Sequence, residues 1–270
     1  QRMADETPLS IHHPEAIAVG GVVVIQELFG VSDHIETVCQ RLAHSGWLAV
    51  APHLFWRSGD PIVPTDDFGT ALEHTGKLTA DSILTDVDAA LAYIEGAGFP
   101  LDAAGVVGFC MGGSVAFAVA TQRPIGAAVT YYGGGILEGR FGFAPMAEAA
   151  PGLQVPWLGL YGDQDASIPS DQVEQLREAA EQAEAPTEIV RYPDAGHAFN
   201  RDGGASYHEG SANDGWHRAR GWCGGHLRTP RLTRSQSSRL MPLGESTGTS
   251  IYSRSSPPPD LGVNSSSHSW

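Results

Sequence analysis

A cysteine lies at the centre of the clearest chemical signal in the sequence. Cys110 belongs to the run Gly108-Phe109-Cys110-Met111-Gly112-Gly113, between a predicted strand and a predicted helix. This is the G-x-C-x-G-G form of the nucleophile elbow, a sharp turn that presents a nucleophile at the end of a strand. Side chains at Gly108 and Gly112 would collide with the neighbouring helix and strand, and the helix N-terminus favours a thiolate. The alternative is a buried structural cysteine beside a tight turn.

Two further runs supply an acid and a base. Gly162-Asp163-Gln164-Asp165 follows a predicted strand, and either aspartate is a candidate acid; a surface turn is the alternative. His197 lies in a glycine-containing loop after the next strand, which suits a general base. The order Cys110, Asp165, His197 is the chain order of α/β-hydrolase triads. Because strand ends of one parallel sheet share an edge, the three side chains are predicted to meet there.

The loop after the first strong strand is the candidate oxyanion hole. Residues 26–30 read Gln-Glu-Leu-Phe-Gly, in the position that supplies an oxyanion-hole amide in such folds. The amides of Leu28 and Met111 are therefore the expected pair. Glu27 is unusual because a carboxylate that ends an apolar strand is costly to bury unpaired. Partial exposure at the rim of the site is the alternative.

Strands and helices must alternate to position these residues. The predicted strands are 19–26, 47–51, 105–109, 125–132, 155–161 and 187–192. The predicted helices are 32–46, 78–94, 111–121, 170–184 and 207–227, and residues 53–78 are predicted to be a loop. This alternation predicts an α/β fold with a doubly wound, mostly parallel sheet.

The composition excludes several classes of partner. The 270 residues carry 16 basic and 31 acidic side chains, a net charge of −15, which argues against nucleic-acid binding through phosphate neutralisation. No apolar run approaches the roughly 20 residues of a membrane span, and Gln1–Ser10 has no signal-peptide core. Three cysteines form no disulfide framework. We therefore expect a cytoplasmic monomer that acts on a small molecule, with neither nucleic acid nor membrane as a partner.

The C-terminal segment has a different composition. Residues 228–270 hold five arginines against Glu245 and Asp260, and 24 of these 43 residues are Ser, Pro, Thr or Gly. Such a segment has too little apolar content to offset its ordering entropy. The sequence predicts one domain over 1–227 and a disordered tail over 228–270, either a natural tail or the product of a frameshift.

Several runs resemble the dienelactone hydrolase (carboxymethylenebutenolidase) family of the α/β-hydrolase superfamily. They are VVVIQELFGV at 22–31, VAPHLF at 50–55, GVVGFCMGGSVAF at 105–117, YYGGG at 131–135, GDQDASIP at 162–169 and YPDAGHAFNR at 192–201. The resemblance implies an α/β-hydrolase fold and hydrolysis of a lactone or carboxylic ester. It places the nucleophile at Cys110, the base at His197 and the acid at Asp165 rather than Asp163, with a thiol-ester intermediate.

The resemblance also assigns roles to Glu27 and Arg201. Glu27 falls where the family's glutamate helps to generate the thiolate, although His197 could activate the thiol instead. Arg201 falls where an arginine engages the substrate carboxylate. A second such arginine is not assigned in segment 57–80, where Arg57 and Lys77 are the only Arg or Lys residues.

Other departures leave an alternative function open. The short stretch before residue 19 leaves open whether an edge strand or hairpin is present, and the last predicted helix is rich in glycine. A catalytically impaired relative that acts as a ligand-binding module is therefore the alternative. We expect no cofactor or metal, since His217, Cys223 and His226 fit no standard zinc spacing and no phosphate-binding glycine loop occurs.

Overall fold

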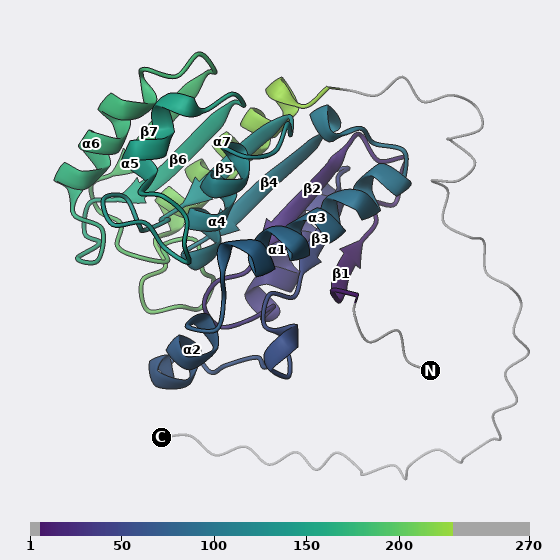
Figure 1. Ribbon diagram of the computed structural model, residues 1–270, viewed down its shortest axis with the longest axis horizontal. Coiled ribbons are helices and arrows are strands. Elements are labelled where there is room, and N and C mark those ends of the chain that lie inside the picture. Colours follow the sequence, from purple (N-terminus) through teal and green to yellow (C-terminus); the bar gives the residue numbers. More distant parts are fainter. Residues whose placement is uncertain (1–5, 229–270) are drawn as a thin grey trace, which may run out of the picture.

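A seven-stranded sheet runs through the centre of the molecule (Figure 1). The structure is a computed structural model that describes residues 6–228. The strand order is β1-β3-β2-β4-β5-β6-β7, with β1 antiparallel to β3 and all other neighbours parallel. The strands are β1 Leu9–His12, β2 Gly21–Ile25, β3 Leu48–Pro52, β4 Ala104–Phe109, β5 Ala127–Tyr131, β6 Trp157–Gly162 and β7 Thr187–Tyr192. The predicted doubly wound, mostly parallel sheet is confirmed. Apart from Arg228, the predicted tail lies outside the described residues.

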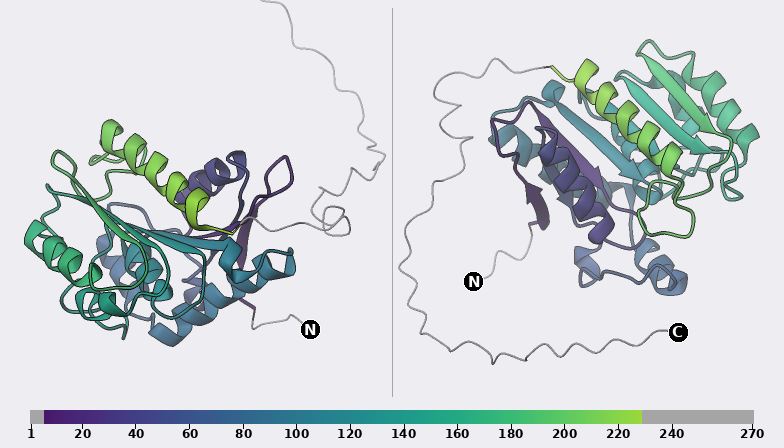
Figure 2. Two further views of the ribbon diagram at one scale, coloured as in Figure 1. Left: turned by 90° about the horizontal axis from the view of Figure 1, so that it is seen from above. Right: turned by 180° about the vertical axis from the view of Figure 1, so that it is seen from behind.

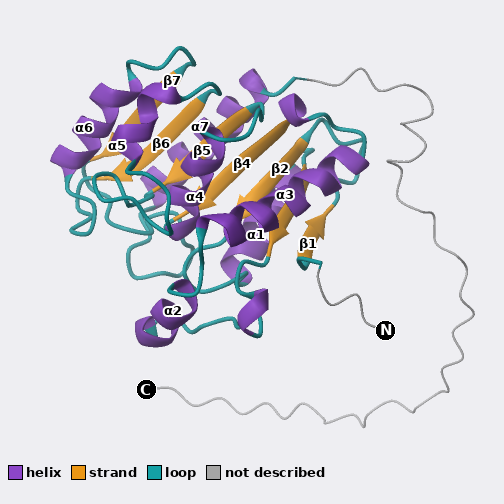
Figure 3. Ribbon diagram, viewed as in Figure 1, coloured by secondary structure: helices purple, strands orange, loops and turns teal. Residues whose placement is uncertain are grey.

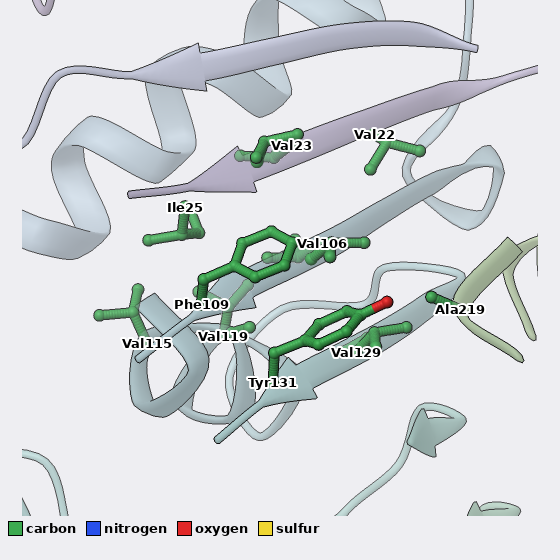
Figure 4. Packing of buried hydrophobic residues seen from close by; sticks show 14 of the residues in the cluster. Val22, Val23, Ile25, Val106, Phe109, Val115, Val119, Val129, Tyr131 and Ala219 are labelled. Atoms are coloured by element: carbon green, nitrogen blue, oxygen red, sulfur yellow. The ribbon is translucent and has the colours of Figure 1, made fainter. Parts of the chain in front are cut away.

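The central strands are buried on both faces, which explains their unbroken apolar sequences. Every residue of β2 and β4 is buried, as expected for parallel strands covered by helices on both sides. Figure 4 shows side chains of these strands packed together, with Val106 and Phe109 of β4 beside Val129 and Tyr131 of β5. The rings of Phe109 and Tyr131 stack at 4.6 Å between centroids. The strand that leads to Cys110 is thus fixed by the core.

Helices cover both faces of the sheet. The helices of the described chain are α1 Asp33–His44, α2 Phe68–Thr75, α3 Ala80–Gly96, α4 Met111–Ala120, α5 Met146–Ala149, α6 Ser170–Ala180 and α7 Glu209–His226. Helices α1 and α7 lie on one face, while α3, α4 and α6 lie on the other (Figure 2). In α1 the buried side chains recur at helical spacing, at Ile35, Val38, Cys39 and Leu42. Loops and α2 gather beyond the carboxyl ends of the central strands (Figure 3).

Two elements differ from the sequence prediction. The N-terminal segment does form an edge strand, β1, which pairs with β3 from Leu9↔Pro52 to His12↔Ala49. Segment 53–78, predicted to be a loop, contains a short 3₁₀ turn at Trp56–Ser58 and the helix α2. Ala71 is the only buried residue of α2. Asp67 caps the helix by accepting a hydrogen bond from the Thr70 amide at 3.1 Å.

Candidate active site

The turn between β4 and α4 holds Cys110 in a strained conformation. Cys110 has φ 54° and ψ −115°, a region that L-residues rarely adopt. Its neighbours must be glycines, because a Cβ at Gly108 would lie 1.8 Å from the Gly112 carbonyl oxygen. A Cβ at Gly112 would lie 2.4 Å from the Ile25 carbonyl oxygen. The turn therefore packs directly on the end of β2, as the elbow pattern predicts.

His197 connects Cys110 to Asp165. Its Nε2 lies 3.1 Å from Cys110 Sγ, and its Nδ1 lies 2.5 Å from Asp165 Oδ2. The other carboxylate oxygen of Asp165 accepts hydrogen bonds from the Ser167 amide at 2.9 Å and from its hydroxyl at 2.6 Å. Asp163, the other candidate acid, instead pairs with Arg191 at 2.7 Å. The three residues at the ends of three strands thus form one continuous chain of contacts.

These contacts shift the protonation of His197 and Asp165. Burial alone lowers the pKa of His197, but the hydrogen bonds to Asp165 and Cys110 outweigh it and raise the pKa to about 10. Burial raises the pKa of Asp165, yet hydrogen bonds from His197 and Ser167 bring it below its ordinary value. The pair therefore favours an imidazolium beside an ionised carboxylate.

Glu27 is fully buried and paired with Arg201. The carboxylate lies at the end of β2, and its Oε2 accepts hydrogen bonds from Arg201 Nε, at 2.9 Å, and from Nη2. The other oxygen, Oε1, has no hydrogen-bond partner. The guanidinium also stacks 4.7 Å from the Phe29 ring centroid. The alternative of a partly exposed Glu27 is therefore wrong, because an arginine from a distant loop compensates its burial.

Tyr132 and the half-buried His34 lie within electrostatic range of this pair. The Tyr132 hydroxyl is buried without a hydrogen-bond partner, and burial followed by the charges of Glu27 and Cys110 raises its pKa. Its ring lies 5.2 Å from that of His197. Burial lowers the pKa of His34 despite the opposing charge of Glu27. Motif reasoning assigned neither residue a role.

A cavity of about 700 Å³ opens beside Cys110. Its walls come from the loop after β2, segment 65–68, the acid loop and the loop after His197. The lining residues are Leu28, Phe29, Thr65, Phe68, Cys110, Arg140, Ser167, Ile168, His197, Ala198 and residues 201–206. Leu28 lines the cavity, and Met111 begins α4 directly after Cys110. First-turn amides of a helix lack intrahelical acceptors, so the Met111 N–H is available to a ligand.

Sequence reasoning missed Ser167 and Arg140. Ser167 was visible only as part of the run after Asp165, and Arg140 lies in the loop between β5 and α5, just beyond the YYGGG run but in no quoted motif. Within the described part of the chain, no group of three or more His, Cys, Asp or Glu side chains is arranged to hold a metal ion. In the same residues, 6–228, no helix is long and apolar enough to span a membrane.

Comparison with known proteins places this geometry in a family. The profile of the dienelactone hydrolase family matches residues 10–227. The chain belongs to the dienelactone hydrolase family. It is 40% identical over 226 residues to a Salmonella typhimurium protein named "Putative carboxymethylenebutenolidase", covering 81% of this chain and 82% of that one. An Escherichia coli protein of the same name is 41% identical over 207 residues, covering 74% and 75%.

A solved structure of the family shares the fold. The crystal structure titled a "Putative Dienelactone Hydrolase" from Klebsiella pneumoniae superposes with a TM-score of 0.73 at 36% identity. The match covers 82% of this chain and all of that one. The expected α/β-hydrolase fold is thereby confirmed, and so is the expected enzyme class, an ester or lactone hydrolase.

Proposed function

We propose that this dienelactone hydrolase family member cleaves a lactone or carboxylic ester through Cys110 and a thiol-ester intermediate. The observation that carries the proposal is the unbroken Asp165–His197–Cys110 contact at the wall of a 700 Å³ cavity. A cysteine hydrogen-bonded to a base, which is oriented by a carboxylate, is the arrangement of an activated nucleophile. The same contact argues against the alternative of an impaired, ligand-binding relative, because none of the three residues is displaced.

In the first step the Cys110 sulfur attacks the substrate carbonyl carbon. His197 holds the thiol proton as an imidazolium, and Asp165 stabilises that cation and fixes the orientation of the ring. The carbonyl oxygen becomes an oxyanion, for which the Leu28 and Met111 amides are the proposed donors. The acyl C–O bond then breaks, the leaving oxygen takes the proton from His197, and a thiol ester remains on Cys110.

In the second step water hydrolyses the thiol ester. His197, now neutral, accepts a proton from the water as it attacks the acyl carbon. Collapse of this second oxyanion breaks the C–S bond, releases a carboxylic acid and returns the thiol. Ser167 helps by donating hydrogen bonds to Oδ1 of Asp165, so that Oδ2 stays directed at His197.

Glu27 and Arg201 are proposed to respond to the substrate. In the structure Arg201 holds Glu27, while His197 is the base in contact with the thiol. This supports His197 as the proton acceptor before substrate binds. A substrate carboxylate that drew Arg201 away would leave Glu27 unpaired and more basic, so that it could act as a second acceptor.

The wider setting follows from the same residues. Cys39, Cys110 and Cys223 are free thiols in the structure, which suits a reducing compartment. We propose a cytoplasmic enzyme that acts as a monomer on small molecules, with neither nucleic acid nor membrane as a partner.

Hydrolysis by a Cys110→Ala variant tests the proposal. We expect the purified protein to hydrolyse enol-lactones or p-nitrophenyl acetate, and Cys110→Ala to lose activity by about 10³-fold or more. Mass spectrometry of the wild type after brief mixing with p-nitrophenyl acetate should show an acetyl group on Cys110. Cys39→Ala is the control, because that buried thiol lies in α1 away from the cavity. Full activity of Cys110→Ala would refute the nucleophile.

A further inference from the structure

One arginine at the catalytic cavity makes no ion pair with a carboxylate among the described residues. Within residues 6–228, seven arginines pair with carboxylates, namely Arg57, Arg123, Arg177, Arg191, Arg201, Arg218 and Arg228. Arg140 makes no such pair in this part of the chain, yet it lines the same cavity as Cys110 and His197. In a protein with net charge −15, an arginine without an acidic partner at this place calls for a physical explanation.

The backbone fixes where the Arg140 side chain lies. Arg140 begins a tight turn closed by the Phe143 amide, which donates to the Arg140 carbonyl at 2.8 Å, with Phe141 and Gly142 at positive φ. The side chain lies across Gly134 and Gly135. A Cβ at Gly134 would come 2.6 Å from Arg140 Nη2, and a Cβ at Gly135 would come 2.9 Å from its Cγ. Two consecutive glycines thus leave the space that this side chain occupies.

Gly134 also connects this arginine to the nucleophile elbow. Ser114, in the second turn of α4, donates a hydrogen bond to the Gly134 carbonyl at 2.6 Å. A Cβ at the preceding Gly133 would lie 2.7 Å from the Gly113 carbonyl carbon. The glycine run that Arg140 lies across is therefore packed on α4, the helix that follows Cys110.

The other arginine of the cavity is already neutralised. Arg201 lines the cavity as well, but its charge is paired with buried Glu27. Asp202, the adjacent residue, adds a negative charge on that side of the cavity. Arg140, contributed by a different loop, is thus the cation free to receive an anionic group in the substrate-free protein.

We propose that Arg140 binds an anionic group of the substrate and selects anionic over neutral substrates. A guanidinium presents a planar pair of donors that fits a carboxylate, so a carboxylate is the group that we assign to it. The proposal rests on the proposed function in that it takes the cavity beside Cys110 as the substrate site. It adds a residue that neither the motifs nor the family resemblance indicated.

Alkylation of Cys110 tests Arg140 without requiring turnover. Iodoacetate and iodoacetamide are nearly the same size and differ in charge, and mass spectrometry reports the modification of Cys110 separately from that of buried Cys39 and Cys223. We expect Arg140→Gln to lower the ratio of the iodoacetate to the iodoacetamide rate by about 3- to 10-fold, as removal of one nearby charge would. Arg140→Lys should keep most of the ratio, and Arg220→Gln, an exposed arginine outside the cavity, should keep all of it. An unchanged ratio in Arg140→Gln would overturn the proposal.

Ester hydrolysis provides the second readout. We expect Arg140→Gln to lower kcat/KM for the p-nitrophenyl monoester of succinate about tenfold or more while leaving p-nitrophenyl butyrate within twofold. An equal loss on both esters would overturn the selective role. If the wild type hydrolysed neither ester while the alkylation ratio still fell in Arg140→Gln, the hydrolase proposal would fail and the anion site would stand.

Discussion

At the scale of the residue, folding strongly raises the pKa of His197, the residue in contact with the Cys110 thiol. Its pKa of about 10 in the fold compares with an ordinary value of 6.5. A raised pKa means that the charged form stabilises the folded state, fully below pH 6.5 and progressively less as the pH rises through about 10. We therefore expect the stability of the wild type relative to His197→Gln to decline between these values. Urea unfolding at pH 6, 8 and 10 measures it, and parallel pH profiles of the two proteins would contradict the prediction.

A second residue-scale prediction concerns the buried Glu27–Arg201 pair. Arg201→Gln leaves a buried carboxylate uncompensated, so we expect a loss of about 3 kcal/mol in the free energy of unfolding. The double variant Glu27→Gln/Arg201→Gln removes both charges and should recover most of that loss. Chemical denaturation of the wild type, both single variants and the double variant completes the cycle. Additive losses would show that the two residues do not interact.

From the sequence we could predict the positions of residues that are set by the conformation of the neighbouring backbone. Cys110 could be placed because glycines at 108 and 112 are required by the turn itself, and His197 because it follows a strand. The partner of Glu27 depends on a loop 174 residues away, so its burial could not be predicted from its neighbours. The same holds for Arg140, which reaches the cavity only through the path of the β5–α5 loop.

At the scale of the element, short and polar pieces were the ones that sequence patterns missed. Strand β1 has four residues, three half-buried and one exposed, and it exists because β3 offers a free edge. Segment 53–78 is held by buried Asp86 of α3. The carboxylate of Asp86 accepts from Trp56 Nε1 at 3.0 Å, Arg57 Nη1 at 2.7 Å and Thr7 Oγ1 at 2.6 Å. Such long-range hydrogen bonds leave no periodic signal in the sequence.

Asp86 should therefore anchor the start of that segment. We expect Asp86→Ala to lose about 3 kcal/mol or more, because it leaves Arg57 and Trp56 without their buried acceptor. Limited proteolysis should then cleave within 53–78 sooner than in the wild type. Asp88→Ala serves as the control. Asp88 lies on α3 like Asp86, but it is half-exposed and pairs with Arg123, so its loss should lower the free energy of unfolding by under about 1 kcal/mol. Equal effects of the two substitutions would contradict the anchoring role.

Helix α7 contains exposed glycines whose replacement should stabilise the protein. Gly221, Gly224 and Gly225 have open space where a Cβ would lie, so they weaken the helix without serving a close contact. We expect Gly221→Ala and Gly224→Ala each to stabilise the protein by about 0.5–1 kcal/mol. Gly215→Ala is the contrasting variant, because its Cβ would lie 3.3 Å from Tyr131. Thermal unfolding of the three variants measures the effect, and a loss of stability at Gly221 would contradict it.

At the scale of the whole molecule, the family match ends at a residue that is packed against the sheet. The family profile ends at residue 227, and the buried Leu227 side chain packs against Gly105 and Gly126 at the start of the central strands. Arg228 then donates its amide to the Asp102 carbonyl at 2.9 Å. The end of the family match and the burial of Leu227 support the proposal of a catalytic domain over 1–227, with 228–270 as a separate segment that the domain does not need. Arg228 is the first residue of that segment and still contacts the domain.

Shortening the chain tests that division. A protein that ends after Arg228 retains α7 and Leu227, which pack against the sheet. We therefore expect its melting temperature to stay within about 2 °C of that of the full chain, and its ester hydrolysis rate within twofold. Leu227→Ala in the full chain should instead lower the free energy of unfolding by about 2–4 kcal/mol, since it removes a buried side chain that packs against the sheet. Calorimetry and p-nitrophenyl acetate hydrolysis measure both variants. If the shortened protein lost stability as Leu227→Ala does, residues 229–270 would have to belong to the folded unit, and the boundary near residue 227 would be wrong.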